Sequence, residues 1–418
     1  MSAPAAAQAA SPSALPSAAQ ACARPCPVCA STQAQALQSL SLPQPSGSPL
    51  PSGYRLMACA ACDFVFAETP APQSAYDLYY QRCAKYGGPT GTGAGLHSAD
   101  QARLDQMADR LLAWLPQPQG RVLDLGCGAG GLLSALQARG LQQVEGLDPD
   151  PSAVQAARAR GLLLREGLIH EAASRCAGER YDLIVLSHVA EHLRDLHSLP
   201  ALASLLTPEG RLYIEVPHPA GYACGERPPY YYFDSEHINH FSAQALARLL
   251  APAGLQLLSA EAVQLPLAGG SHYPALAVVA GFGGDPHAGA ALSPQPATVQ
   301  AVQRYLVDCA QGARREPQPP LPPQGPVLAW GAGSWAQRLL GQGQLPRDRL
   351  VAFLDKDPNK QGLQLDGLPI LAPAVGLQQH PQAAILVCVA IDPQQITDDL
   401  DALAPGARQR LHFLSNPT

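Results

Sequence analysis

Residues 122–131 join a short apolar strand to a helix through a glycine-rich turn. Asp124 lies near the end of the strand, and Gly126, Gly128 and Gly130 follow at every second position. Glycine lets the backbone turn sharply and approach a ligand closely, because it carries no Cβ. In a dinucleotide-binding fold the corresponding turn faces a pyrophosphate and has the spacing GxGxxG. The run therefore predicts a cofactor turn at the mouth of a parallel sheet.

The chain around this turn alternates short apolar runs with amphipathic ones. Such alternation predicts an α/β fold with a doubly wound parallel sheet. The expected strands are 122–125, 143–147, 162–165, 183–187 and 211–216, with a final strand at 276–280. The expected helices are 99–115, 131–139, 152–160 and 243–253.

The spacing of the turn, Asp-x-Gly-x-Gly-x-Gly, resembles the class I S-adenosylmethionine-dependent methyltransferases rather than the dinucleotide-binding enzymes. A second acid, Asp148, closes the next strand, where a carboxylate can accept both hydroxyls of a ribose. The resemblance implies that Asp124 lies near the amino group of the cofactor and that the adenine lies beside residues 166–168. The alternative is an NAD-binding turn or a purely structural loop. The implied cofactor-binding residues are Asp124, Gly126, Gly128, Gly130, Asp148, Gly167, Leu168 and His188.

Two cysteine pairs, Cys26/Cys29 and Cys59/Cys62, precede this domain. Four thiolates can surround a zinc ion tetrahedrally, which leaves no open position and therefore favours a structural site. The spacer between the pairs is longer than the usual ~15–20 residues, and a Pro/Ser/Gly-rich loop at 43–54 accounts for the excess. A redox pair or unpaired core thiols are the alternatives.

A segment at 230–242 follows the fifth strand and gathers aromatic, acidic and imidazole groups. Glu236 and His237 are adjacent, and His240 follows. A carboxylate beside a histidine can set its tautomer and pKa, so that the imidazole acts as a general base. We predict a catalytic or substrate-binding role here, with a histidine that only hydrogen-bonds a loop as the alternative.

The whole arrangement resembles the zinc-containing sugar C-methyltransferases, which act on nucleotide-linked keto-deoxysugars. Glu236 and His237 match the Glu-His pair of that family, and residues 269–271 match its Gly-Gly-Ser. The resemblance implies that His237 removes a proton alpha to a ketone and that Glu236 orients it. A tyrosine, Tyr79 or Tyr232, would help to hold the enolate or the sugar. Competing hypotheses are an O- or N-methyltransferase acting on a glycan or natural-product intermediate, and a scaffold with a vestigial methyltransferase core.

A second strand-turn-helix unit begins near residue 327, after a Pro-rich segment at 317–326. Its turn contains Gly331 and Gly333, and Asp355 ends the next strand, but the third glycine of a dinucleotide fingerprint is missing. We therefore expect a smaller Rossmann-like domain that is structural or encloses the substrate, with a second nucleotide site as the alternative.

Composition limits the partners. Only 14% of the residues are charged and the net charge is -6, so no basic field exists to attract nucleic acid or a membrane surface. We expect a small-molecule substrate, a cytoplasmic location given the scattered remaining cysteines, and a monomer or homodimer. The expected organisation is a disordered tail (1–20), a zinc module (21–70), the methyltransferase domain (71–285), a linker with one helix (286–325) and the C-terminal domain (326–418).

Overall fold

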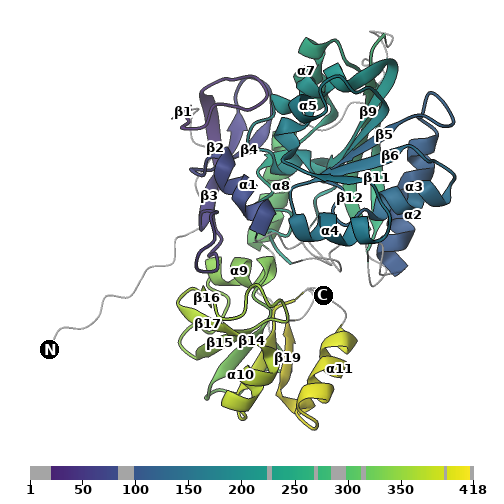
Figure 1. Ribbon diagram of the computed structural model, residues 1–418. Coiled ribbons are helices and arrows are strands. Elements are labelled where there is room, and N and C mark those ends of the chain that lie inside the picture. The colour runs from purple at the N-terminus through teal and green to yellow at the C-terminus, as the bar shows by residue number, and fades with distance from the viewer. Residues whose placement is uncertain are drawn as a thin grey trace.

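Three sheets organise the part of the chain that the structure describes. The computed structural model describes residues 20–82, 98–223, 228–267, 272–283, 298–311, 317–389 and 393–414. The predicted tail, apart from residue 20, and the match at 269–271 lie outside these ranges. Figure 1 shows the N-terminal module beside the central domain, with the C-terminal domain below both.

The central sheet has seven strands in the order β11-β12-β9-β8-β5-β6-β7. Its five parallel strands are β5 (Val122–Leu125), β6 (Val144–Asp148), β7 (Leu164–Glu166), β8 (Tyr181–Ser187) and β9 (Leu206–Pro217). The strands β11 (Gln256–Pro266) and β12 (His272–Gly281) run antiparallel to their neighbours. The predicted parallel sheet is therefore found in five strands but not at this edge, where β11 and β12 are joined by a short connection that only antiparallel neighbours allow.

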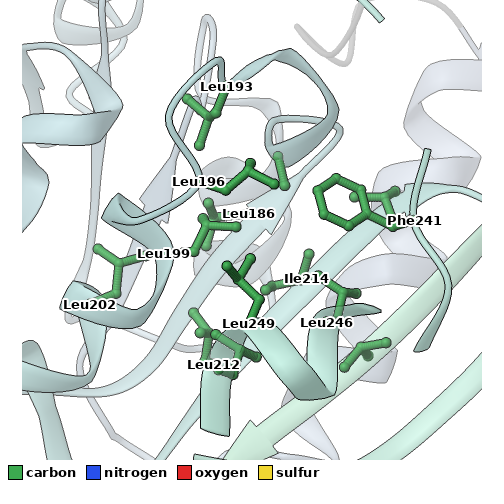
Figure 2. Packing of buried hydrophobic residues seen from close by; sticks show 14 of the residues in the cluster. Leu186, Leu193, Leu196, Leu199, Leu202, Leu212, Ile214, Phe241, Leu246 and Leu249 are labelled. Atoms are coloured by element: carbon green, nitrogen blue, oxygen red, sulfur yellow. The ribbon is translucent and has the colours of Figure 1, made fainter. Parts of the chain in front are cut away.

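Helices cover both faces of this sheet. They are α2 (Ser98–Leu112), α3 (Gly131–Ala138), α4 (Pro151–Ala159), α5 (Ala172–Arg175), α6 (Ser198–Ala201) and α7 (Ala243–Leu250). On one face, Leu246 and Leu249 of α7 lie beside Ile214 of β9 (Figure 2). Each fully buried leucine contributes ~1.5–3 kcal/mol relative to an exposed one. The packing of α7 on this face therefore stabilises the central sheet.

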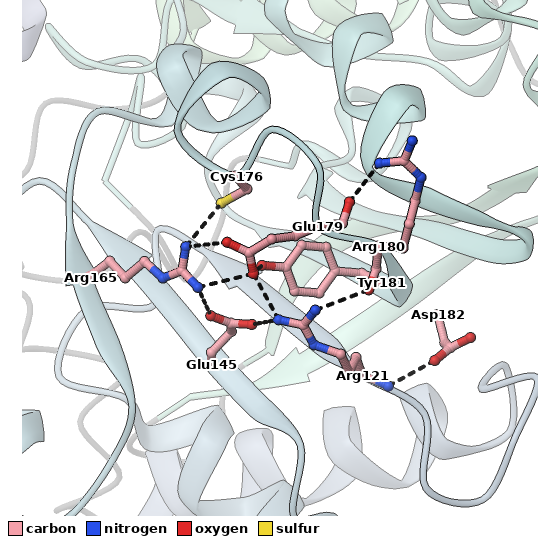
Figure 3. A network of polar contacts seen from close by, with 8 residues as sticks. All are labelled: Arg121, Glu145, Arg165, Cys176, Glu179, Arg180, Tyr181 and Asp182. Atoms are coloured by element: carbon pink, nitrogen blue, oxygen red, sulfur yellow. Dashed lines mark hydrogen bonds and ion pairs between the residues drawn. The ribbon is translucent and has the colours of Figure 1, made fainter.

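Salt bridges join the ends of the strands that lie far from the glycine turn. Arg121 and Arg165 both contact Glu145 and Glu179, and Arg165 lies 2.7 Å from Glu145 and 2.6 Å from Glu179 (Figure 3). The guanidinium of Arg121 also lies over the ring of Tyr181, 4.6 Å from its centre. This network ties β5, β6, β7 and β8 together, because each of these residues lies on or beside one of those strands.

The N-terminal module shares its sheet with the segment predicted to be catalytic. Its strands are β1 (Gln20–Ala21), β2 (Gln33–Ser41), β3 (Gly53–Cys59) and β4 (Val65–Glu68), and α1 (Gln73–Arg82) follows. The short strand β10 (Asn239–His240) pairs antiparallel with β4. The module is therefore built into the central domain, and β10 fixes where the preceding residues lie.

The helix expected within a linker is part of the core. Helix α8 (Thr298–Gln311) buries Val302, Tyr305 and Cys309 in a cluster with residues of the N-terminal module. The backbone N–H of Thr298 donates to the carboxylate of Asp63 at 2.5 Å. The described helix thus packs between the module and the aromatic segment at 230–233.

The C-terminal domain has a seven-stranded sheet in the order β13-β19-β18-β14-β15-β17-β16. The five inner strands are parallel: β14 (Val327–Trp330), β15 (Leu350–Leu354), β17 (Leu368–Leu371), β18 (Ala384–Val387) and β19 (Leu411–Leu414). The edge strands β13 (Pro317–Gln318) and β16 (Gln364–Leu365) are antiparallel. The Pro-rich segment expected to be a linker therefore begins as a strand. The helices are α9 (Ser334–Gly341), α10 (Pro373–Gln379) and α11 (Pro393–Leu403).

The Pro/Ser/Gly-rich loop between the cysteine pairs contacts this domain. The N–H of Ser46 donates to the carbonyl of Gln364 at 2.7 Å, and the N–H of Gln364 donates to the hydroxyl of Ser46 at 2.9 Å. Gln44 donates to Gln337 of α9 at 3.4 Å. The long spacer thus joins the first and last parts of the chain.

No helix in the described ranges is long and apolar enough to span a membrane.

Candidate functional site

The first glycine turn holds its shape through positions that only glycine accommodates. Gly126 has φ +76°, and a Cβ there would lie 2.5 Å from Val189. Gly128 has φ +51°, and its N–H donates to Asp148 at 2.7 Å. Gly130, the residue before α3, has φ +78°, and a Cβ there would lie 2.6 Å from Leu162. Gly126 and Gly128 line a cavity, whereas Gly130 serves the packing behind the turn.

Two buried carboxylates lie at the carboxyl ends of neighbouring strands. Burial raises the pKa of Asp124 to about 7, with a further contribution from the charge of Asp148. Burial also raises the pKa of Asp148 to about 6, although hydrogen bonds from the N–H groups of Asp150 and Gly128 oppose the shift. A cationic or hydroxyl-bearing ligand would favour the ionised form of both acids.

A cavity of about 670 Å³ opens at this edge of the sheet. Asp124 and Asp148 line one side of it, and Ser334 and Arg338 of α9 line another. Ligands commonly bind at the carboxyl ends of strands in α/β sheets and between domains. This cavity lies both at the carboxyl ends of strands and between two domains.

Gly167 and Leu168 are among the residues predicted to lie beside an adenine. Gly167 is buried, and its N–H donates to the carbonyl of Asp148 at 3.0 Å. Neither Gly167 nor Leu168 lines the cavity, but the next residue, Ile169, does. His188 lines the cavity as predicted and has φ +54°, a left-handed conformation that is uncommon outside glycine.

Three imidazoles that line the cavity surround one buried carboxylate, Glu191, which does not line the cavity itself. Glu191 has a fully buried side chain, and its Oε1 lies 3.1 Å from Nδ1 of His188 and 4.0 Å from Nε2 of His192. A ring nitrogen of His237 lies within 4.8 Å of a carboxylate oxygen of Glu191 and of a ring nitrogen of His192. Burial favours the neutral acid, but His192, His188 and His237 together outweigh it and lower the pKa of Glu191 to about 2. The cluster therefore holds an ionised carboxylate next to groups that can carry a proton.

His237 reaches the cavity through a turn that Asp234 stabilises. The carboxylate of Asp234 accepts the N–H groups of Glu236 at 3.1 Å and His237 at 3.0 Å. The ring of His192 lies 4.9 Å from that of His237, and its Nδ1 lies 3.0 Å from the carbonyl oxygen of Glu236. Two histidines from distant parts of the chain therefore form one wall.

Glu236 is buried and does not line the cavity. It is 1% exposed, and it accepts hydrogen bonds from the hydroxyls of Tyr79 at 3.1 Å and Tyr80 at 3.2 Å. Tyr80 lines the cavity, whereas Tyr79 and Glu236 do not. The carboxylate grouped with the rings of His192 and His237 is Glu191, whereas Glu236 binds the two tyrosines of α1.

His240 and Tyr232 belong to the aromatic core. Strand β10 pairs His240 with Val65, and the side chain of His240 packs against Phe233 with its Nδ1 3.0 Å from the hydroxyl of Tyr222. Burial lowers the pKa of His240 to about 3, so the imidazole is neutral. Tyr232 stacks on Tyr222 at 4.1 Å. Neither residue lines the cavity, since β10 pairs His240 with β4 and Tyr232 packs within the aromatic cluster.

The four cysteines of the N-terminal pairs come together. The sulfurs of Cys26 and Cys62 lie 3.6 Å apart, those of Cys29 and Cys59 lie 3.5 Å apart, and all four lie within 4.8 Å of one another. Tetrahedral zinc with Zn–S bonds of ~2.3 Å requires sulfurs about 3.8 Å apart. All four are free thiols and are not paired in disulfides. This donor set fits zinc.

Several residues of the site carry no signal that sequence reasoning used. Glu191 and His192 follow the expected strand 183–187, and Tyr80 is adjacent to Tyr79. Arg338 lies beyond the second glycine turn. An acid-histidine pair directly after a strand that ends at the cofactor edge is the signal that could have identified Glu191 and His192.

Similarity to known proteins falls on the central domain. A family model described as a methyltransferase domain matches residues 96–260. The ubiquinone biosynthesis O-methyltransferase of Xanthomonas axonopodis pv. citri is 32% identical over 201 residues, which cover 44% of this chain and 81% of that protein. The ubiquinone biosynthesis O-methyltransferase of Xanthomonas campestris pv. campestris is 36% identical over 126 residues, which cover 28% of this chain and 50% of that protein.

Solved structures of methyltransferases also superpose on part of the chain. The S-adenosylmethionine-dependent methyltransferase of Methanosarcina mazei does so with a TM-score of 0.34 and 15% identity, over 42% of this chain and 98% of that one. The glycopeptide N-methyltransferase MtfA in complex with S-adenosylmethionine gives a TM-score of 0.34 and 15% identity, over 43% of this chain and 93% of that one.

Proposed function

We propose a reaction from one established premise: this chain belongs to the class I S-adenosylmethionine-dependent methyltransferases and is an enzyme. The proposed reaction is methyl transfer to a polar small molecule from which His237 first removes a proton. The observation that carries this proposal is that His237 lines the same cavity as Asp124 and Asp148. A base and a cofactor cradle therefore face one space.

The cofactor is expected to be held by the first glycine turn and its two acids. Gly126 and Gly128 leave room for close approach, Asp148 can accept the hydroxyls of a ribose, and Asp124 can pair with an amino group. When bound, S-adenosylmethionine supplies an electrophilic methyl group on a positively charged sulfur. The chain contributes mainly alignment, which can lower a barrier by roughly 7–11 kcal/mol.

Proton removal is assigned to His237, with Glu191 as the carboxylate that supports the charge. When His237 takes up a proton, the ionised Glu191 beside it stabilises the imidazolium. This differs from the role expected for Glu236, whose carboxylate accepts the hydroxyls of two tyrosines. General-base assistance of this kind typically contributes 10²–10⁴-fold in rate.

The acceptor that we favour is a nucleotide-linked keto-sugar or a similar polar metabolite, methylated on carbon. The support is the resemblance in the sequence together with an imidazole at the position of the family's base. Methylation on carbon requires a base, because a carbon acid must be ionised before it can attack. The acceptor would lie against Tyr80, which lines the cavity and whose hydroxyl donates to Glu236.

Methylation on oxygen is the second candidate. The observation that favours it is the similarity to the ubiquinone biosynthesis O-methyltransferases. In that reaction His237 would deprotonate a hydroxyl group. The cavity and His237 are compatible with both acceptors, since the same imidazole can remove a proton from carbon or from oxygen.

Solvent exchange separates the two reactions. The protein is incubated in D₂O with S-adenosylhomocysteine and candidate nucleotide-linked keto-sugars, and deuterium incorporation alpha to the ketone is followed by NMR. We expect exchange with the natural chain and none with His237→Gln. With labelled S-adenosylmethionine, ¹³C NMR then distinguishes a carbon-bound from an oxygen-bound methyl. An oxygen-bound methyl without exchange contradicts the C-methyl reaction.

We propose a structural zinc ion at Cys26, Cys29, Cys59 and Cys62. Because β10 pairs with β4 of this module, loss of the metal is expected to loosen the segment that carries His237 as well. Elemental analysis should give one zinc per chain, and Cys26→Ser should lower both the melting temperature and the metal content. Protein that is expressed with zinc but contains none would contradict this assignment.

A further inference from the structure

Arg338 is a buried cation in the wall of the cavity. It lies on α9, is 5% exposed, and donates from Nη1 to the carbonyl of Phe233 at 3.0 Å. Its guanidinium lies over the ring of Tyr231, 5.6 Å from the centre. Both Arg338 and Tyr231 line the cavity. The side chain is thus held in place with its charge at the cavity surface.

The hydrogen-bonding capacity of Arg338 is largely unused. Its Nε has no partner among the described residues, and no described acid forms an ion pair with it. Arg24, which is equally buried, donates to three oxygen atoms, and Arg110 pairs with Glu215 at 2.9 Å. A buried charge without a counter-charge is costly. Arg24 has three neutral acceptors in place of a counter-charge, whereas Arg338 has one, so an anion in the cavity could supply the acceptors that Arg338 lacks among the described residues.

The first turn of α9 adds to the positive potential at this place. Gly333 precedes the helix without a side-chain cap, and Gly333 and Ser334 line the cavity. The helix dipole favours an anion at such an end. The helix has eight residues, and Arg338 lies one turn further along it.

The cavity is divided by charge. Asp124, Asp148 and Asp150 line the side formed by the first turn, whereas Arg338 lines the side formed by α9. Arg103 also lines the cavity and acts on the charge of Asp124, but it is paired with Asp100 at 3.1 Å. Asp234 is the acid of the 230–242 segment in the wall, and one of its oxygens accepts two backbone N–H groups. An acceptor with an anionic group would therefore enter with that group toward α9 and away from the two cofactor acids.

We propose that Arg338 and the first turn of α9 form a subsite for an anionic group, phosphoryl or carboxylate, of the acceptor molecule. The proposal rests on the proposed function in one respect, that an acceptor enters this cavity. Arginine suits such groups because its planar fork can donate two parallel hydrogen bonds. The subsite would fix the orientation of the acceptor relative to His237.

Binding of small anions to the full-length protein saturated with S-adenosylhomocysteine tests the proposal without turnover. Inorganic pyrophosphate and malonate serve as the phosphoryl and carboxylate probes in separate titrations by calorimetry. We expect one of them to bind, and Arg338→Met to weaken it at least 10-fold. Arg338→Lys should retain part of the affinity, because it keeps the charge but not the fork.

Arg349→Met is the matched control, since Arg349 donates to the carbonyls of Gly325 and Gln324 and does not line the cavity. It should bind the probe within 2-fold of the natural chain. Affinity for S-adenosylhomocysteine reports whether each variant is folded. The subsite is overturned if neither probe binds to the natural chain, or if Arg338→Met binds as tightly as Arg349→Met. Anion binding in a protein that transfers no methyl group would instead count against the proposed function alone.

Discussion

The chain contains two glycine turns that share two backbone hydrogen bonds but differ in dihedral angles, since Gly130 before α3 has φ +78° and Gly333 before α9 has φ -93°. In the first, the N–H of Gly126 donates to the carbonyl of Leu147 at 2.8 Å, and in the second Gly331 donates to Leu354 at 2.7 Å. Each turn also donates an N–H to the acid that ends the next strand. The distances are 2.7 Å to Asp148 and 2.9 Å to Asp355.

The two acids differ in what surrounds them. Asp355 pairs with the ammonium of Lys360 at 3.2 Å and does not line the cavity. Asp148 lines the cavity, and no cation of the described chain forms an ion pair with it. The acid beside the first turn is therefore open to a ligand, whereas the acid beside the second turn is paired with a side chain of the protein. Backbone geometry alone does not make a cofactor site.

The largest expected effect is that of substituting His237, which tests whether the reaction depends on the groups around the first glycine turn. His237→Gln should lower kcat by about 10²–10⁴-fold, because the base is lost, while the affinity for S-adenosylhomocysteine stays the same. Steady-state kinetics and calorimetry measure the two quantities. His240→Phe is the matched control and should keep activity within about threefold, since His240 is neutral and lies in the aromatic core. Equal losses in both variants would contradict the assignment.

Exchanging the two acids tests the comparison directly. Asp148→Ala should weaken S-adenosylhomocysteine binding by at least about 100-fold, since hydrogen bonds to a charged group contribute roughly 1.5–3 kcal/mol each. Asp355→Ala should leave the affinity within about twofold, because Lys360 already neutralises this acid. A comparable loss in Asp355→Ala, in protein that remains folded, would indicate a second cofactor site.

The pH dependence of binding sharpens the same contrast. The pKa values of Asp124 and Asp148, about 7 and about 6, lie above the usual range, so both acids take up protons as the pH falls from 8 to 5.5. A ligand that needs the ionised acids then binds more weakly, by up to about tenfold per pH unit for each acid below its pKa. Asp124→Asn should flatten this dependence when the affinity is measured at several pH values. A slope that is unchanged in the variant would show that Asp124 is not involved.

The same shifts predict how stability changes with pH. Both acids have higher pKa values in the folded protein than in the unfolded chain, so the folded state keeps protons that the unfolded state has lost between about pH 4 and 7. Their contribution to stability is therefore lost as the pH rises through the folded values. Thermal melts without ligand should show Asp124→Asn gaining stability relative to the natural chain at pH 8 and not at pH 4.

The smallest expected effect concerns the second turn. Lys360→Met removes the partner of Asp355 and should lower stability by only about 0.2–1 kcal/mol, because the pair is partly exposed. Differential scanning calorimetry would register this as a small decrease in the melting temperature. The affinity for S-adenosylhomocysteine should not change. A large loss of cofactor binding would mean that the two turns are coupled.

The strands and helices of the central domain could be predicted from the sequence where local residue patterns determine them. The parallel strands and the helices α3 and α4 fall within a few residues of their expected positions, because apolar periodicity and glycine positions act locally. Strand β11 was missed, since one of its faces is only partly buried and its residues show no clear alternation. Its orientation depends on a hairpin with β12, which is a pairing between strands and not a property of either one.

The sequence by itself determined the cradle of the site. The turn, Asp124 and Asp148 are placed by a continuous strand-turn-helix unit and the strand beside it, so their spacing is enough to bring them together. Tertiary structure decided which groups complete the cavity. Glu191 lies beside His237, Glu236 turns to two tyrosines, His240 joins the core and Arg338 arrives from another domain. These outcomes depend on strand pairing and domain packing between residues far apart in the chain, and local spacing does not encode those contacts.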